Sequence, residues 1–201
     1  MTGTSEKIWL DDSCYLVHYS EFLERQCADS LFDLFQKTLL WQRSTVTLFG
    51  KQHAIPRLNA WYGDQPYQYS GTQFAARELT TELSELKSQL QRLTELRFNS
   101  VLANLYRCGA DRVGWHRDNE KSLGPEPQIA SISLGSTRRF LLREKLKPKN
   151  KIAINLAGGS LLLMRGATQI RWEHSLPATK TPVGPRINLT FRRCCCAGSP
   201  E

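Results

Sequence analysis

The part of the chain that most restricts its fold is the second half, which consists of short strand-like segments. From residue 99 onward, apolar and β-branched residues recur in brief alternating runs separated by turn-forming residues. The predicted strands cover residues 100–107, 129–134, 139–144, 151–156, 160–164, 169–174 and 186–193. So many strands in so short a stretch are typical of an antiparallel sandwich or jelly roll. Gly158-Gly159 predicts a tight hairpin between two of them.

The first half of the chain predicts two helices. One runs from a cap at Ser20 to about Trp41, and the other, with leucines at steps of three and four, covers 74–97. Between them, residues 45–50 alternate as a strand that ends at a turn. The expected fold class is therefore α+β, mainly β, with the N-terminal helices packed on one face of the jelly roll.

The length and the cysteines bound the organisation of the chain. A length of 201 residues fits one domain, with 1–98 as a helical lid portion, 99–193 as the jelly-roll core and 194–201 as a flexible tail. The six cysteines form no CxxC pair, which indicates a reducing compartment, the cytoplasm or the nucleus, and not a disulfide framework. No apolar run reaches the length of a membrane span or a signal peptide, so we expect no membrane partner. We also expect the chain to be a monomer.

The charge of the chain favours an anionic partner. The net charge of +8 and the pI near 9.3 suit nucleic acid or an anionic membrane face. A soluble protein that is merely basic is the alternative.

Two histidines and an aspartate form a candidate metal site. In an extended segment residues i and i+2 point to the same side, so His116 and Asp118 can reach one point together. If His174 joins them from a distant strand, two imidazoles and one carboxylate form the facial triad of non-haem Fe(II) oxygenases. The alternative for so short a motif is an ordinary pair of surface residues.

A second group of polar residues alternates along the last predicted strand. Arg186, Asn188, Thr190 and Arg192 share one face, opposite Ile187, Leu189 and Phe191. Two guanidinium groups on one face would bind a dicarboxylate by bidentate contacts, unless the row is the cationic outer face of a sandwich. Asn104 and Tyr106 also share a face and offer hydrogen bonds to the same dicarboxylate, unless they form a satisfied polar pair in the core.

Together these motifs, with Ile132-Ser133-Leu134-Gly135, resemble the AlkB family of Fe(II)- and 2-oxoglutarate-dependent nucleic-acid demethylases, from about Leu48 to Arg192. The resemblance implies a double-stranded β-helix with Fe(II), 2-oxoglutarate and dioxygen as cofactors. It implies that His116, Asp118 and His174 are the catalytic metal ligands. It further implies that Arg186 binds the distal carboxylate of 2-oxoglutarate with Asn104 and Tyr106, and that Asn188 and Arg192 lie near its metal-chelating end.

The front half resembles the lid and hairpin of family members that repair duplex DNA. The matching segments include Phe49-Gly50-Lys51, Pro56-Arg57 and 67–71, so the implied substrate contacts are Leu48, Phe49, Gly50, Arg57, Tyr67, Tyr69 and Glu120. Leu48, Phe49 and Gly50 would enter the base stack, unless the two apolar residues are buried in a strand. Tyr69 would stack on the extruded base opposite His116, and Glu120 would face its cationic ring.

The implied reaction is removal of the N-methyl group of 1-methyladenine or 3-methylcytosine in double-stranded DNA, with release of formaldehyde. Asn119 stands where the duplex-acting relatives usually carry an acid, which leaves the preferred lesion open. One alternative is a demethylase of RNA or single strands. The other is a nucleic-acid-binding module without turnover.

Overall fold

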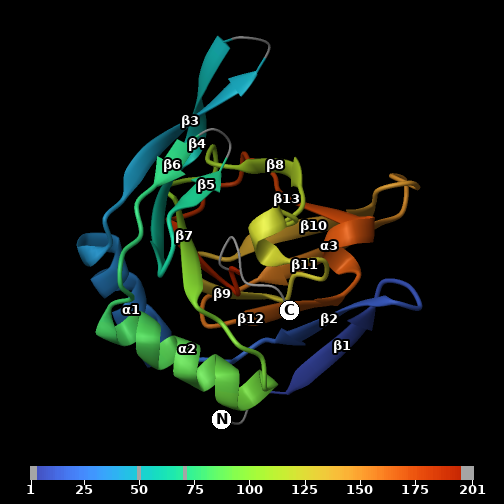
Figure 1. Ribbon diagram of the computed structural model, residues 1–201, viewed down its shortest axis with the longest axis horizontal. Helices are drawn as coiled ribbons and strands as arrows, with labels where there is room; N and C mark the ends of the chain where they lie inside the picture. The colour runs from blue at the N-terminus through green and yellow to red at the C-terminus, as the bar shows by residue number, and fades with distance from the viewer. Residues whose placement is uncertain (1–3, 49–50, 70–71, 196–201) are drawn as a thin grey trace.

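Two antiparallel sheets face each other, and two helices cover the outer side of the larger one (Figure 1). This computed structural model describes residues 4–48, 51–69 and 72–195. In spatial order the major sheet contains β1 (Ser5–Trp9), β2 (Cys14–Tyr19), β12 (Leu161–Gly166), β9 (Ile129–Gly135), β14 (Arg186–Arg192), β7 (Ser100–Tyr106), β4 (Lys51–Gly63) and β3 (Gln42–Leu48).

The minor sheet contains β11 (Lys151–Leu156), β10 (Arg138–Glu144), β13 (Trp172–Leu176) and β8 (Val113–His116). A separate hairpin pairs β5 (Tyr67–Tyr69) with β6 (Thr72–Phe74). The described helices are α1 (Arg25–Thr38), α2 (Thr81–Thr94), the short α3 (Thr168–Arg171) and the 3-10 turn η1 (Lys121–Leu123). This arrangement confirms the predicted jelly-roll class with helices on one face.

The alternation of side chains along the strands creates two cores on opposite sides of the major sheet. Ile187, Leu189 and Phe191 of β14 pack with α1 and α2 in the outer core. Residues such as Met164 and Leu142 fill the space between the two sheets. The other face of β14 points into that same space, where it lines a cavity. The polar row is therefore an inner surface, and the alternative of a cationic outer face is wrong.

Both N-terminal helices are shorter than the sequence predicts. The first helix begins after Glu24, not at Ser20, because residues 20–24 form a turn in which the Leu23 amide donates to Gly159 O. The second helix begins after Thr80, whose side chain accepts from the Leu83 amide, and ends at Glu95 in the left-handed conformation. Phe74 belongs to β6 instead. Apolar residues that precede and follow each helix in the sequence pack in the same core as the helices. They continue the apolar periodicity, and the sequence therefore predicts helices that are too long.

The front half is also richer in strands than expected. Residues 1–98 contribute β1 to β6, and β1, β2, β3 and β4 belong to the major sheet. The expectation of a mainly helical front portion is corrected accordingly. Among the described helices, none combines the length and apolarity that crossing a bilayer requires.

Two further local predictions differ from the structure, and one strand of the second half was not predicted. Gly158-Gly159 is not a hairpin, because it joins β11 of the minor sheet to β12 of the major sheet. The predicted strand 169–174 begins later, at Trp172, and its first residues form α3. Strand β8 was not predicted, because its four residues, Val113–His116, are too few to show a period.

The predicted flexible tail of residues 194–201 is wrong for Cys194 and Cys195. Cys194 is buried, and its backbone exchanges two hydrogen bonds of 2.8 Å with the side chain of Asn99. The Cys195 amide donates to Ser122 O of η1. These two residues are therefore part of the fold, whereas the prediction for 196–201 lies outside the described residues.

Candidate metal centre and co-substrate pocket

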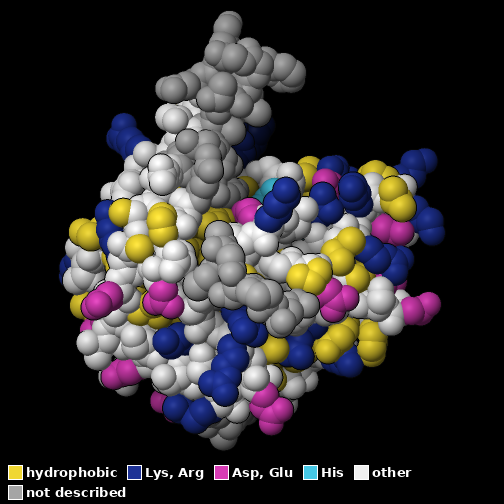
Figure 2. Space-filling view, in the orientation of Figure 1, with side chains coloured by type: hydrophobic (Ala, Val, Ile, Leu, Met, Phe, Trp, Pro, Cys, Tyr) yellow, Lys and Arg dark blue, Asp and Glu magenta, His cyan; other side chains and the backbone are white. Residues whose placement is uncertain are grey.

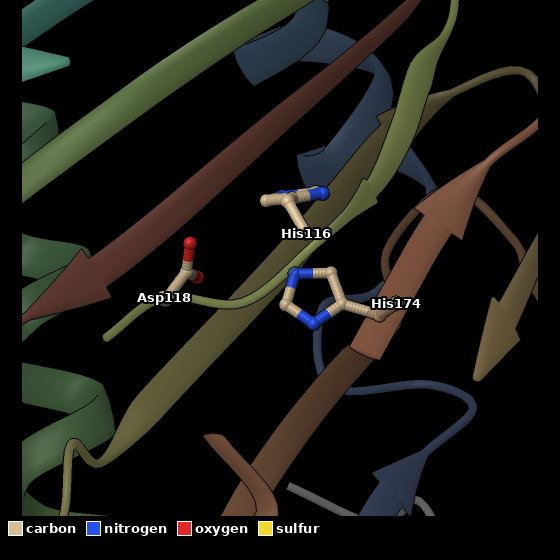
Figure 3. A group of neighbouring side chains, drawn as sticks. All are labelled: His116, Asp118 and His174. Atoms are coloured by element: carbon tan, nitrogen blue, oxygen red, sulfur yellow. The ribbon is translucent and has the colours of Figure 1, made fainter. Parts of the chain in front are cut away.

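The structure brings the three predicted metal ligands together between the sheets (Figure 3). His116 is the last residue of β8 and is the cross-strand partner of His174 on β13. Asp118 follows in the irregular segment after β8. One ligand atom from each residue lies within 4.8 Å of the others, and the two imidazole centroids are 4.3 Å apart. Two nitrogens and one carboxylate oxygen suit Fe(II) and leave coordination positions open.

The protein fixes the orientation of the His116 ring. Its Nδ1 lies 2.9 Å from Gly114 O, an atom that only accepts hydrogen bonds. Nδ1 therefore carries the proton and donates to this carbonyl. This tautomer leaves Nε2 as the unprotonated nitrogen for a metal.

The electrostatics of the triad favour the forms that bind a metal. Burial, assisted by the neighbouring His116, lowers the pKa of His174 to about 3, so its imidazole is neutral at physiological pH. Burial also lowers the pKa of His116. Burial opposes ionisation of Asp118, but the positive charge of Arg192 outweighs burial and lowers the Asp118 pKa. Neutral imidazoles and an ionised carboxylate are the ligand states a divalent ion requires.

Arg186 lies in the same cavity as the triad and is the best candidate for binding a carboxylate. Its side chain is 2% exposed, its Nη2 donates to Ser133 Oγ at 2.9 Å, and its guanidinium lies 5.4 Å from the Tyr106 ring centroid. Burial lowers the Arg186 pKa to about 10, which still leaves the group charged at neutral pH. Within the described residues, its Nε has no hydrogen-bond partner and no acidic side chain pairs with it. A buried cation with unused donors fits the carboxylate of 2-oxoglutarate.

Three asparagines form a polar row across the major sheet beside the triad. In the strand register, Asn59 of β4 faces Asn104 of β7, and Asn104 faces Asn188 of β14. Asn104 Oδ1 accepts from Arg57 Nε at 2.9 Å and from Asn59 Nδ2 at 2.7 Å. Asn188 donates in turn to Ser131 Oγ at 2.7 Å. These hydrogen bonds fix the side chain of Asn104. The contacts of Asn104 and Asn188 with 2-oxoglutarate stay predictions.

Arg192 connects the metal centre to the predicted substrate side. Its Nη2 donates to Asp118 Oδ1 at 2.9 Å, and its Nη1 donates to the hydroxyl of Tyr67 at 2.5 Å. The Tyr67 hydroxyl donates to Glu120 Oε1 at 2.6 Å. A chain of hydrogen bonds thus joins the carboxylate of Glu120 to that of Asp118.

Tyr67, a predicted substrate contact, is mostly buried in the protein. It is 3% exposed and stacks on Trp61, with ring centroids 4.2 Å apart. Together with Phe74, Leu123 and Cys194, this pair forms a small core that fastens the β5–β6 hairpin and η1 to the sheet. Only the hydroxyl edge of Tyr67 faces Glu120.

Other predicted substrate contacts fall at the edge of the described structure. Phe49 and Gly50 lie outside the described residues, as do the side chains of Leu48 and Tyr69. The backbone of Leu48 pairs with Lys51 in the β3–β4 hairpin. Residues 51–54 of β4 pair with β3 alone, and this part of the hairpin projects from the body of the molecule (Figure 1).

Sequence reasoning missed two polar residues of this region. Asn59 follows Arg57 at i+2 on β4, so the same alternation that links Arg186 to Asn188 would have found it. Gln169 Oε1 accepts from the Asp118 amide at 2.9 Å, although 51 residues separate them. Only the tertiary structure shows this second contact.

Comparison with known proteins agrees with this geometry. The family model described as the 2OG-Fe(II) oxygenase superfamily matches residues 15–192. Human DNA oxidative demethylase ALKBH2 is 36% identical over 187 residues, which cover 87% of this chain and 72% of that protein. The chain belongs to the AlkB family. Membership of the superfamily implies Fe(II), 2-oxoglutarate and dioxygen as cofactors, in agreement with the sequence.

Other AlkB-family relatives are longer than this chain. Alpha-ketoglutarate-dependent dioxygenase alkB homolog 3 of Bos taurus is 41% identical over 187 residues, covering 85% of this chain but 63% of the relative. The chain therefore spans just under two thirds of that protein. Among solved structures, that of OsALKBH1 has a TM-score of 0.67 at 17% identity and covers 94% of this chain and 100% of the other. That likeness supports the AlkB-family fold.

Proposed function

We propose that this chain is an oxidative demethylase that acts on 1-methyladenine and 3-methylcytosine in DNA. The observation that carries the proposal is the shared cavity of His116, Asp118 and His174 with the buried cation of Arg186. A facial metal triad beside an acceptor site for a carboxylate is the arrangement that 2-oxoglutarate-dependent oxidation needs. When bound, Fe(II) with 2-oxoglutarate and dioxygen supplies the oxidation that hydroxylates the N-methyl carbon and leads to release of formaldehyde.

The residues of the cavity divide the work between them. His116, Asp118 and His174 hold the metal, in the protonation states described above. Arg186 binds the distal carboxylate of 2-oxoglutarate, and Asn104 and Tyr106 orient it from β7. Apolar residues of the cavity, including Leu102, Met164 and Phe140, restrict the access of water to the reacting atoms.

Glu120 is the proposed selector of the methylated base. Its Oε1 is held by Tyr67, while Oε2 is buried and has no hydrogen-bond partner among the described residues. A carboxylate oxygen in this state suits an exocyclic amino group, which adenine and cytosine both carry. Its negative charge also favours the cationic ring of the N-methylated base over the neutral normal base.

The surface supports nucleic acid as the partner. Figure 2 shows Lys and Arg side chains beside the visible His side chain and along the projecting β10–β11 side. Lys145, Lys147 and Lys149 are exposed on the connection between β10 and β11, and Lys151 is exposed at the start of β11. Such charge attracts the phosphate backbone of either DNA or RNA. The similarity to ALKBH2, a DNA oxidative demethylase, favours DNA, and the projecting β3–β4 hairpin favours a duplex.

The test measures methyl loss by mass spectrometry on oligonucleotides that carry 1-methyladenine or 3-methylcytosine. Single-stranded DNA, duplex DNA and RNA are compared, with Fe(II) and 2-oxoglutarate present. We expect loss of the methyl mass with wild type, none with His116→Ala, and wild-type chemistry with His18→Ala, a half-buried histidine of β2 that does not line the cavity. Activity on RNA or single strands alone would favour the first alternative. Tight binding without succinate formation would favour a non-catalytic module.

A further inference from the structure

Helix α3 lies between the segment that carries Asp118 and the strand that carries His174. It is four residues long, and β13 begins directly after it, so Gln169 precedes His174 by five positions. Gln169 is completely buried, and its Oε1 accepts from the amide of Asp118 at 2.9 Å. The same short helix therefore contacts one metal ligand and leads into the strand of another.

The Asp118 backbone depends on this contact. Residues 117–120 lie outside the described strands and helices, so no sheet partner receives the Asp118 amide. Asp118 is 2% exposed, and leaving a buried amide without a hydrogen-bond acceptor is unfavourable. Gln169 supplies that acceptor, while Arg192 holds the carboxylate of the same residue. Asp118 is thus held at both its main chain and its side chain.

The orientation of the Gln169 amide is determined by its surroundings. A backbone N–H only donates, so the carbonyl oxygen and not the NH2 group must face Asp118. The NH2 group points to Met164 Sδ, at 3.3 Å, a weak acceptor. The helix itself is fixed on its far side, since Asp11 accepts from Arg171 at 3.2 Å and from Trp172 Nε1 at 2.9 Å. Gln169 therefore offers the Asp118 amide a hydrogen-bond acceptor at a fixed position.

We propose that Gln169 is a positioning residue of the metal centre, which sets the place of Asp118 relative to His174 without touching the metal. The inference rests on the proposed function only in requiring that the triad binds a divalent ion. Partners of this kind, one step removed from a metal, typically change metal affinity by about 10- to 100-fold when they are lost.

The experiment measures Mn²⁺ binding to the metal-free protein by titration, without 2-oxoglutarate or nucleic acid. Gln169→Met keeps the length of the side chain and removes the acceptor, while Gln169→Glu keeps an acceptor oxygen. Thr168→Val is the matched control, because Thr168 is buried in the same helix and its hydroxyl donates to Arg165 O instead of Asp118. Melting temperatures of the metal-free proteins report folding separately.

We expect Gln169→Met to weaken Mn²⁺ binding about tenfold, Gln169→Glu to recover most of that loss, and Thr168→Val to bind like wild type. Wild-type affinity in Gln169→Met would overturn the proposal, as would equal losses in Gln169→Met and Thr168→Val. Absence of Mn²⁺ binding by wild type would overturn it too. Failure to demethylate DNA, with these affinities as expected, would contradict the proposed substrate alone.

Discussion

Arg192 and Asp118 form an ion pair of 2.9 Å in which both side chains are almost completely buried. One partner is a predicted metal ligand and the other belongs to the polar row of β14. Removal of one member leaves an uncompensated charge in the interior, which is more costly than losing a surface pair. The pair therefore contributes both to folding and to the state of the metal ligand.

Arg192→Met is predicted to destabilise the metal-free protein by about 3–5 kcal/mol, because it strands the buried Asp118 carboxylate. Urea unfolding of Arg192→Met, Asp118→Asn and the double variant measures this. Because the residues share one contact, the double variant should be more stable than the sum of the single effects by about 1–3 kcal/mol. Additive losses would show that the two side chains do not interact in solution.

Arg186→Gln is predicted to weaken the use of 2-oxoglutarate. Loss of a buried charged partner costs about 2 kcal/mol or more, which corresponds to about a 30-fold rise in the 2-oxoglutarate concentration needed for half-maximal succinate formation. Arg139→Gln, at an exposed position of β10, is the control and should behave like wild type. An unchanged 2-oxoglutarate requirement in Arg186→Gln would remove this residue from the co-substrate pocket.

Ionised Asp11 is predicted to stabilise the fold, and this contribution to the free energy of unfolding is lost in acid. Burial opposes its ionisation, but hydrogen bonds from Trp172 and Ser13 outweigh burial and lower its pKa to about 2. An unfolded aspartate has a pKa of about 3.9, so this stabilisation is complete above that pH and is lost as the pH falls from about 4 to 2. Asp11→Asn should reduce the slope of unfolding free energy against pH in that window, whereas exposed Asp12→Asn should keep it. Identical slopes in both variants would contradict the assignment.

Phe49→Ala is predicted to reduce repair of duplex DNA more than repair of single strands. The reason is that an apolar wedge helps only where a base stack must be opened, and opening costs a few kcal/mol. The measurement compares rates on one methylated oligonucleotide with and without its complement. Equal losses on the two substrates would speak against a wedge.

The sequence alone determined the parts of this protein that depend on local periodicity. Alternation along 186–192 placed Arg186 and Asn188 on one face, and the i, i+2 spacing placed His116 beside Asp118. These relationships follow from the two-residue repeat of a strand or extended segment, which every backbone of that kind imposes. The jelly-roll class followed from the number and shortness of the strands.

Only the tertiary structure decided which distant segments meet. Gln169 contacts Asp118, and Asn59 contacts Asn104, through pairings that no local pattern contains. Only the tertiary structure also fixed the helix ends, because buried residues such as Phe22 pack in the same core whether or not they are helical. It likewise showed that Gly158-Gly159 joins two different sheets. Side-chain patterns report which face is buried, but the partner across that face is chosen by packing of the whole chain.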